Sequence, residues 1–175
     1  MGDFILTLHA YNVYLVILSG AISGIWGLIL FFTSKKTAQT VSKHVAKDGE
    51  VAPESQSATN EVAPASVVDT DLNTRAKPWR RALIVTVVLA LLQGLLGITL
   101  LLMGKRPGPP GDSLYYLHFV YGGIAALVIP VATTYATGGK NVRRDILIYS
   151  LAALLLAIVA VRAWMTGPDV FTLLP

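Results

Sequence analysis

The chain has 175 residues, of which 54% are hydrophobic and only 14% are charged. Its mean hydropathy of +0.61 exceeds what soluble domains of this length normally show, and this excludes an ordinary water-soluble globular protein. The sequence contains no cysteine, which excludes disulfides, thiolate metal sites, iron–sulfur clusters and covalently attached c-type haem. Any cofactor must therefore be held by nitrogen or oxygen ligands.

Four apolar stretches are long enough to cross a bilayer, at about residues 4–33, 82–103, 114–135 and 146–164. A span needs roughly 20 apolar residues, because the hydrocarbon core is about 30 Å thick and a helix rises about 1.5 Å per residue. The first stretch follows Asp3 instead of a basic segment and is too long for the apolar part of a signal peptide, so we expect it to be retained. The sequence predicts an all-α, integral membrane, four-helix up-down bundle.

The basic residues predict how this bundle is oriented. Eight of the 14 Lys and Arg residues lie between Ser34 and Arg81, and three more lie between Thr137 and Asp145. The positive-inside rule makes both segments cytoplasmic and places the N-terminus outside. The expected location is the inner (cytoplasmic) membrane of a bacterium, and the bilayer is the first expected partner.

The expected domain division is a first transmembrane helix in 1–34, a flexible cytoplasmic loop in 35–81 and three further helices in 82–175. The loop is rich in Ala, Ser, Thr, Val, Glu and Lys, and it has no aromatic residue before Trp79. Such a segment cannot bury enough apolar surface to fold alone. It is either a plain connector or an arm that becomes ordered on a partner subunit.

Two histidines inside the spans are the main candidates for cofactor ligands, because ionisable residues in a membrane are costly. His9 lies about 5 residues, or roughly 8 Å, inside the first helix, and His118 lies about 6 Å inside the third. Both helices enter from the same side, so the two imidazoles are level. In an up-down bundle these two helices face one core diagonally, and their histidines could bind the two faces of one haem iron. The alternative is a pair of interfacial residues that hydrogen-bond to headgroups, side chains or water.

Small residues and one arginine accompany the histidines. Gly122 and Gly123 follow His118 and leave a patch of the third helix without side chains, where a flat macrocycle could approach. Gly20 and Gly24 in the first helix form a GxxxG pattern that is typical of helix packing. Arg162, near the outer end of the fourth helix, either snorkels to the interface or pairs with haem propionates. The tyrosines and tryptophans, Trp79 among them, are expected mostly in aromatic belts at the interfaces.

The segment Leu92-Gln-Gly-Leu-Leu-Gly-Ile-Thr-Leu100, followed by Leu117-His-Phe-Val-Tyr-Gly-Gly123, resembles the half-bundle pattern of the haem A synthase family and of bis-histidine cytochrome b membrane proteins. The resemblance covers about a quarter of the chain and implies a four-helix bundle in which histidines hold haem. His118 matches the histidine of this pattern, whereas His9 matches by span and depth. The chain has a single bundle and no cysteine pair, so the resemblance implies at most one haem.

Three functions are compatible with these features. The first is a small subunit of a bacterial respiratory or photosynthetic electron-transfer complex, holding one b-type haem with His9 and His118 as metal ligands and with Gly122 and Arg162 beside it. The second is an accessory subunit without haem, and the third is a haem-modifying or quinone-using enzyme. The spans contain no carboxylate for proton chemistry, so a subunit is favoured over an enzyme. Other membrane subunits are expected as partners, and nucleic acid is not.

Overall fold

A computed structural model describes residues 2–48, 65–107 and 115–167, with the backbone alone described for 35–48 and 65–71. The described residues form four helices and no strand, so the prediction of an all-α four-helix bundle is confirmed. Each helix contains a window long and apolar enough to cross a membrane. The helices are α1 (Gly2–Asp48), α2 (Ala65–Leu102), α3 (Tyr116–Tyr135) and α4 (Val142–Met165).

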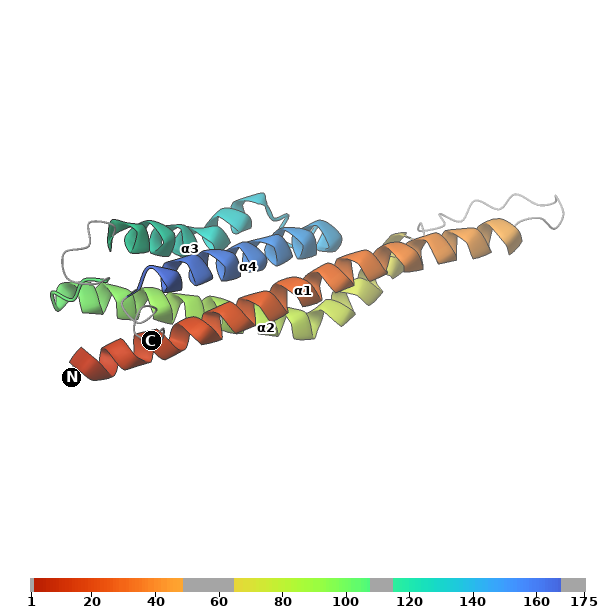
Figure 1. The fold of residues 1–175 in the computed structure, drawn as a ribbon. Helices are drawn as coiled ribbons and strands as arrows, with labels where there is room; N and C mark the ends of the chain where they lie inside the picture. Colours follow the sequence, from red (N-terminus) through yellow and green to blue (C-terminus); the bar gives the residue numbers. More distant parts are fainter. Residues whose placement is uncertain (1, 49–64, 108–114, 168–175) are drawn as a thin grey trace.

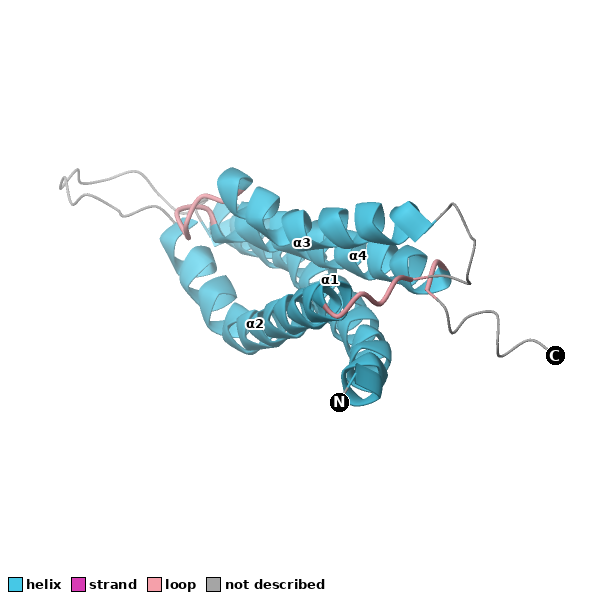
Figure 2. Ribbon diagram, turned by 90° about the vertical axis from the view of Figure 1, so that its left-hand side faces the viewer, coloured by secondary structure: helices cyan, strands magenta, loops and turns pink. Residues whose placement is uncertain are grey.

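Successive helices run in opposite directions, so the start of α1, the end of α2, the start of α3 and the end of α4 meet at one end of the bundle (Figure 1). We call this the N-terminal end. Helix α1 packs closely against α2 and α4, and α3 packs mainly against α4. Helices α2 and α3 make few contacts with each other, and α1 and α3 lie diagonally across the bundle (Figure 2). The bundle is therefore loose along one seam, between α2 and α3.

Helices α1 and α2 are longer than a bilayer requires. Their apolar parts are Gly2–Ser34 and Leu72–Leu102, and both helices continue beyond these parts at the end of the bundle opposite the N-terminus. The loop expected over 35–81 is thus helical in 35–48 and 65–81, while 49–64 lies outside the described residues. A segment that extends an existing helix avoids the cost of nucleating a new one, so it stays helical without a core of its own.

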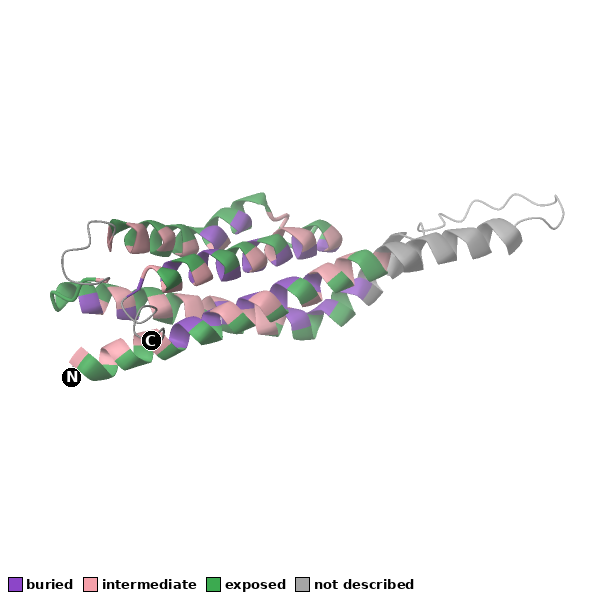
Figure 3. Ribbon diagram, viewed as in Figure 1, coloured by how far each residue is buried: buried purple, intermediate pink, exposed green. Residues whose placement is uncertain are grey.

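The packed interior lies along α4, where half of the apolar window is buried (Figure 3). Helix α1 approaches α4 closely through glycines. A β-carbon added at Gly20 would lie 3.1 Å from the carbonyl oxygen of Ala153, and one added at Gly24 would lie 2.9 Å from that of Ser150. Small residues at such contacts let two backbones approach, and van der Waals packing then holds the helices together. The GxxxG pattern of the first helix therefore serves helix packing.

Trp79 corrects one expectation of the sequence. Its side chain is only 2% exposed and is covered by protein, whereas a residue of an aromatic belt faces the headgroups. The indole Nε1–H donates to the carbonyl oxygen of Ser23 at 2.8 Å, and Gly27 leaves the room that the ring occupies. Burial of an indole is favourable when its N–H finds an acceptor, and here a carbonyl of α1 supplies one. Trp79 thus joins α2 to α1.

Candidate functional site

The two membrane histidines come together in the N-terminal half of the bundle. His9 lies on α1 and His118 lies in the first turn of α3, and their ring centroids are 6.2 Å apart with an angle of 55° between the ring planes. The helices that carry them are diagonal neighbours, so both rings point into the space that α2 and α4 flank. The sequence-based expectation of two level imidazoles facing one core agrees with this placement.

His118 has a defined tautomer. Its Nδ1 lies 2.9 Å from the carbonyl oxygen of Ala163 on α4, and a carbonyl can only accept. Nδ1 therefore carries the proton and donates it to this oxygen. The lone pair is then on Nε2, which is the arrangement that a metal-binding imidazole needs, with the other ring nitrogen held by an acceptor of the protein.

His9 has a different environment. Asn12 donates through Nδ2 to the carbonyl oxygen of Leu89 at 3.0 Å and to Oε1 of Gln93 at 2.8 Å. This fixes the Gln93 amide with its nitrogen towards His9, and Gln93 Nε2 lies 3.3 Å from His9 Nε2. The Gln93 N–H thus donates to Nε2, and the proton of His9 is on Nδ1. That nitrogen is buried and has no hydrogen-bond partner among the described residues.

A cavity of about 380 Å³ lies beside the two rings. All four helices contribute to its lining, which is mostly apolar. Its volume falls within the range of roughly 300–1,000 Å³ that is usual for small-molecule and cofactor sites. The polar groups that reach it are few, and they include His9, His118, Gln93, Lys105 and Arg106.

Glycines on α2 and α3 line this cavity from opposite sides of the loose seam. They are Gly94 and Gly97 on α2, and Gly122 and Gly123 on α3. A β-carbon added at Gly94, Gly122 or Gly123 would meet no atom within 4 Å, in contrast to the glycines of α1. Glycine is less favourable than alanine in a helix by about 1 kcal/mol. Packing within the described part of the chain does not account for these three glycines, which are exposed.

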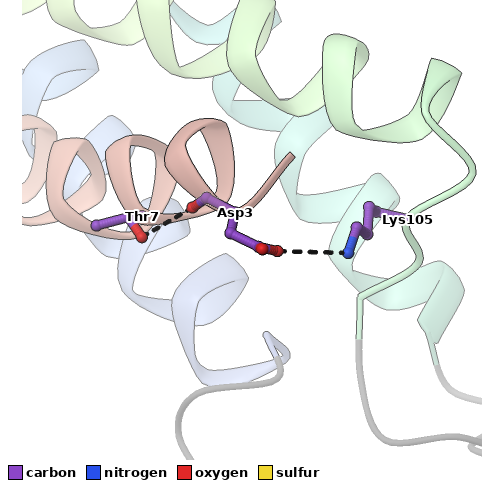
Figure 4. A network of polar contacts seen from close by, with 3 residues as sticks. All are labelled: Asp3, Thr7 and Lys105. Atoms are coloured by element: carbon purple, nitrogen blue, oxygen red, sulfur yellow. Dashed lines mark hydrogen bonds and ion pairs between the residues drawn. The ribbon is translucent and has the colours of Figure 1, made fainter. Parts of the chain in front are cut away.

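Cationic side chains lie at the N-terminal end of the cavity. Lys105 and Arg106 follow the end of α2 and line the cavity mouth. Lys105 Nζ is 3.8 Å from the Asp3 carboxylate, which lies at the start of α1 (Figure 4). This pair is largely exposed, so it contributes little to stability, and the Lys105 ammonium can exchange partners easily.

Arg162, the fourth residue singled out from the sequence, does not line the cavity. Its guanidinium lies 5.7 Å from the centroid of the Tyr121 ring, and Nη1 is 4.0 Å from the sulfur of Met165. The side chain is exposed at the end of α4. The cations that the structure places at the cavity are therefore Lys105 and Arg106.

The donor set limits the chemistry of the site. The described residues include no group of three or more His, Cys, Asp or Glu side chains that could hold a metal ion. A structural Zn²⁺ needs four protein ligands, and a catalytic Zn²⁺ needs three. A metal that already carries four ligands in a macrocycle needs only the two axial ligands that His9 and His118 can provide.

The sequence did not predict the contact between Gln93 and His9. The residues Gly97 and Trp164, which also line the cavity, were not singled out as site residues. A β-carbon at Gly97 would lie 3.3 Å from Cε1 of His9, so this glycine makes room for the histidine ring itself. Gly97 lies four residues before Leu101 and three after Gly94, and this helical spacing is the only feature of the sequence that indicates its place in the cavity.

No protein-family model, curated protein or solved structure matches this chain significantly.

Proposed function

We propose that the protein is a small subunit of a bacterial electron-transfer membrane complex and that it binds one b-type haem between His9 and His118. The observation that carries the proposal is the spacing of the two rings, whose centroids are 6.2 Å apart. Two imidazole nitrogens, each about 2.0–2.1 Å from one metal ion on opposite sides, place the ring centroids about 6 Å apart. The observed spacing of the centroids is compatible with this requirement and supports the proposal, whereas Nε2 of His9 faces the Gln93 amide in the described structure.

The surroundings of the histidines also suit a macrocycle. A flat ligand between two imidazoles must extend sideways, and the loose seam between α2 and α3 lies on that side of the rings. Gly94, Gly122 and Gly123 line this seam and present no side chain to it. The rest of the lining is mostly apolar, which would favour burial of a porphyrin and limit the access of water to the iron.

The charged residues indicate which way such a ligand would lie. Haem carries two propionates on one edge, and carboxylates favour cationic partners. Lys105 and Arg106 at the cavity mouth are the candidates for this role. When bound, haem supplies one-electron redox chemistry, and the residues of this chain hold it in place, orient it and exclude water from it.

The same proposal includes a location and partners. The distribution of Lys and Arg favours the inner membrane of a bacterium, with the N-terminal end of the bundle outside and with other membrane subunits beside it. An electron carrier with a single haem needs a donor and an acceptor, and the exposed apolar surfaces of α2 and α3 are available to neighbouring subunits as well as to lipid.

The test is a titration of haem into purified, detergent-solubilised protein, followed by absorbance spectroscopy before and after reduction with dithionite. We expect one haem per chain, with the sharp α and β bands of low-spin iron in the reduced protein. Gly123→Leu should weaken haem binding by filling the seam while leaving the helical content intact, because its β-carbon would meet no atom within 4 Å. Val120→Leu, an exposed position on the same helix, is the matched control and should bind haem normally. A wild-type protein that takes up no haem would refute the proposal, and the accessory-subunit function would replace it.

A further inference from the structure

The two histidines of the site differ in their hydrogen bonds, although both lie near the N-terminal end of the bundle on diagonal helices. The protein holds His118 by its Nδ1 and leaves Nε2 with an unshared lone pair. It holds His9 by its Nε2, through the Gln93 amide, and gives Nδ1 no acceptor among the described residues. The inference that follows rests on the proposed haem site and concerns the roles of these side chains in it.

His118 is already arranged as a metal ligand. Ligating histidines typically donate their other ring N–H to a carbonyl or carboxylate, which fixes the ring and makes the ligating nitrogen more basic. The carbonyl of Ala163 does this for His118. This carbonyl belongs to the last turn of α4, where it also accepts from the backbone N–H of Thr166 at 3.2 Å and from the Thr166 hydroxyl at 2.8 Å, so the imidazole joins an acceptor that the helix end already holds in place.

His9 would have to change its partners in order to bind iron. Ligation through Nε2 requires loss of the hydrogen bond from Gln93, and no acceptor among the described residues compensates at Nδ1. The Gln93 amide cannot turn over to suit the ring, because Asn12 holds its oxygen and is itself held by the carbonyl of Leu89. Gln93 therefore competes with iron for the same lone pair of His9.

We infer that His118 is the fixed axial ligand of this site and that His9 is an exchangeable one, whose place a neutral diatomic molecule can take beside Gln93. A site with one exchangeable position binds carbon monoxide, nitric oxide or dioxygen in addition to transferring electrons, depending on the polarity and access of the pocket on that side. A displaced His9 would return to the Gln93 amide, which lines the same cavity and carries an N–H that could donate to a bound ligand. The mostly apolar lining beside the histidines admits a neutral diatomic molecule.

The inference predicts different outcomes for the two histidine variants. His9→Ala should retain haem in a five-coordinate, high-spin form, because His118 and its Ala163 partner remain. His118→Ala should lose most of its haem, because the remaining histidine is bound to Gln93. In the wild-type protein, the reduced form should bind carbon monoxide, with a shift of the Soret band that saturates at one molecule per haem.

Gln93→Leu tests whether Gln93 competes with iron for His9 or only supports the packing of the helices. Without the competing donor, His9 binds iron more tightly, so the affinity for carbon monoxide should fall roughly fivefold, as expected for the loss of one hydrogen bond. The low-spin fraction of the ferric protein should rise. Thr86→Val is the matched control: Thr86 is a buried polar residue of α2 that hydrogen-bonds to Ser23, it does not line the cavity, and its removal should leave carbon monoxide affinity unchanged.

The possible results distinguish the proposed haem site from the exchangeable ligation by His9. A wild-type protein without haem removes the proposed function and this inference together. A haem protein that ignores carbon monoxide, or in which both alanine variants lose haem equally, overturns the inference and leaves the proposed function standing. An unchanged affinity for carbon monoxide in Gln93→Leu also overturns it, because the assigned competition would then be absent.

Discussion

The glycines of this chain fall into two groups, and one substitution made in each group tests the division. In Gly24→Ala, the new β-carbon would lie 2.5 Å from Cγ of Leu154 and 2.9 Å from the carbonyl oxygen of Ser150. The leucine side chain can rotate away, but the backbone oxygen can move only if α1 and α4 separate. Overpacking of this kind typically costs about 1–3 kcal/mol, and the gain in helix propensity from glycine to alanine offsets up to about 1 kcal/mol.

In Gly123→Ala the new methyl group meets no atom within 4 Å, so there is no overpacking cost. Only the gain in helix propensity remains. The free energy of unfolding should therefore be lower in Gly24→Ala than in Gly123→Ala by roughly 2 kcal/mol. Equilibrium unfolding of both variants in the same detergent, monitored by circular dichroism, measures this difference. Equal stabilities would refute the assignment of the α1 glycines to packing, and a strongly destabilised Gly123→Ala would refute the assignment of the α3 glycine to ligand clearance.

Two further predictions concern topology and the burial of Trp79. A membrane-impermeant thiol reagent added to intact cells should label Ser113→Cys and leave Ser57→Cys unlabelled, because the basic segments favour a cytoplasmic position for the second site; the reverse labelling pattern would invert the proposed orientation. Trp79→Phe should lower the free energy of unfolding by about 1–3 kcal/mol, because the carbonyl of Ser23 loses a buried donor and the smaller ring leaves a void. The same change at an exposed aromatic residue, Tyr116→Phe, should cost much less.

The membrane spans could be predicted from the sequence because they depend on one local quantity. A run of about 20 apolar residues is costly in water and satisfies its backbone polar groups only as a helix in lipid, so composition alone locates it. The proximity of His9 and His118 follows from the same logic, since counting residues from two helix ends on the same side gives their depth. The diagonal placement of their helices then brings the rings together.

The partners of each side chain could not be predicted in this way, because they depend on how the helices rotate about their axes. The sequence favours an interfacial position for Trp79, yet the rotation of α2 buries the ring against Ser23. The sequence also allows Arg162 to reach the cofactor site, whereas in the structure this side chain lies beside Tyr121. Packing between helices determines such rotations, and a pattern of apolar residues that surrounds a whole helix carries little information about them.

The turn between α3 and α4 leads to a last prediction, because it contains the most heavily hydrogen-bonded carboxylate among the described residues. Asp145 is only 7% exposed. One of its oxygens, Oδ1, accepts from the backbone N–H of Thr137 at 2.6 Å and from the hydroxyl of Thr137 at 2.9 Å, and Oδ2 accepts from the N–H of Gly139 at 2.7 Å. Gly138 and Gly139 both have positive φ, so the turn needs this anchor to keep its shape.

Asp145→Asn keeps the size of the side chain but places an amide NH₂ where one of the carboxylate oxygens accepts. A donor then faces the N–H of Gly139 or the donors of Thr137, and the charge that strengthens all three hydrogen bonds is lost. The expected loss in free energy of unfolding is about 1.5–3 kcal/mol, and backbone amide exchange should accelerate at Gly139 more than in the α1–α4 interior. Asn141→Asp is the matched control, since a carboxylate at this helix start can still accept from the N–H of Arg144 and should preserve stability. Equal exchange rates at Gly139 in wild type and Asp145→Asn would show that the turn is held by its backbone alone, and that the carboxylate does not order the approach of α3 to α4.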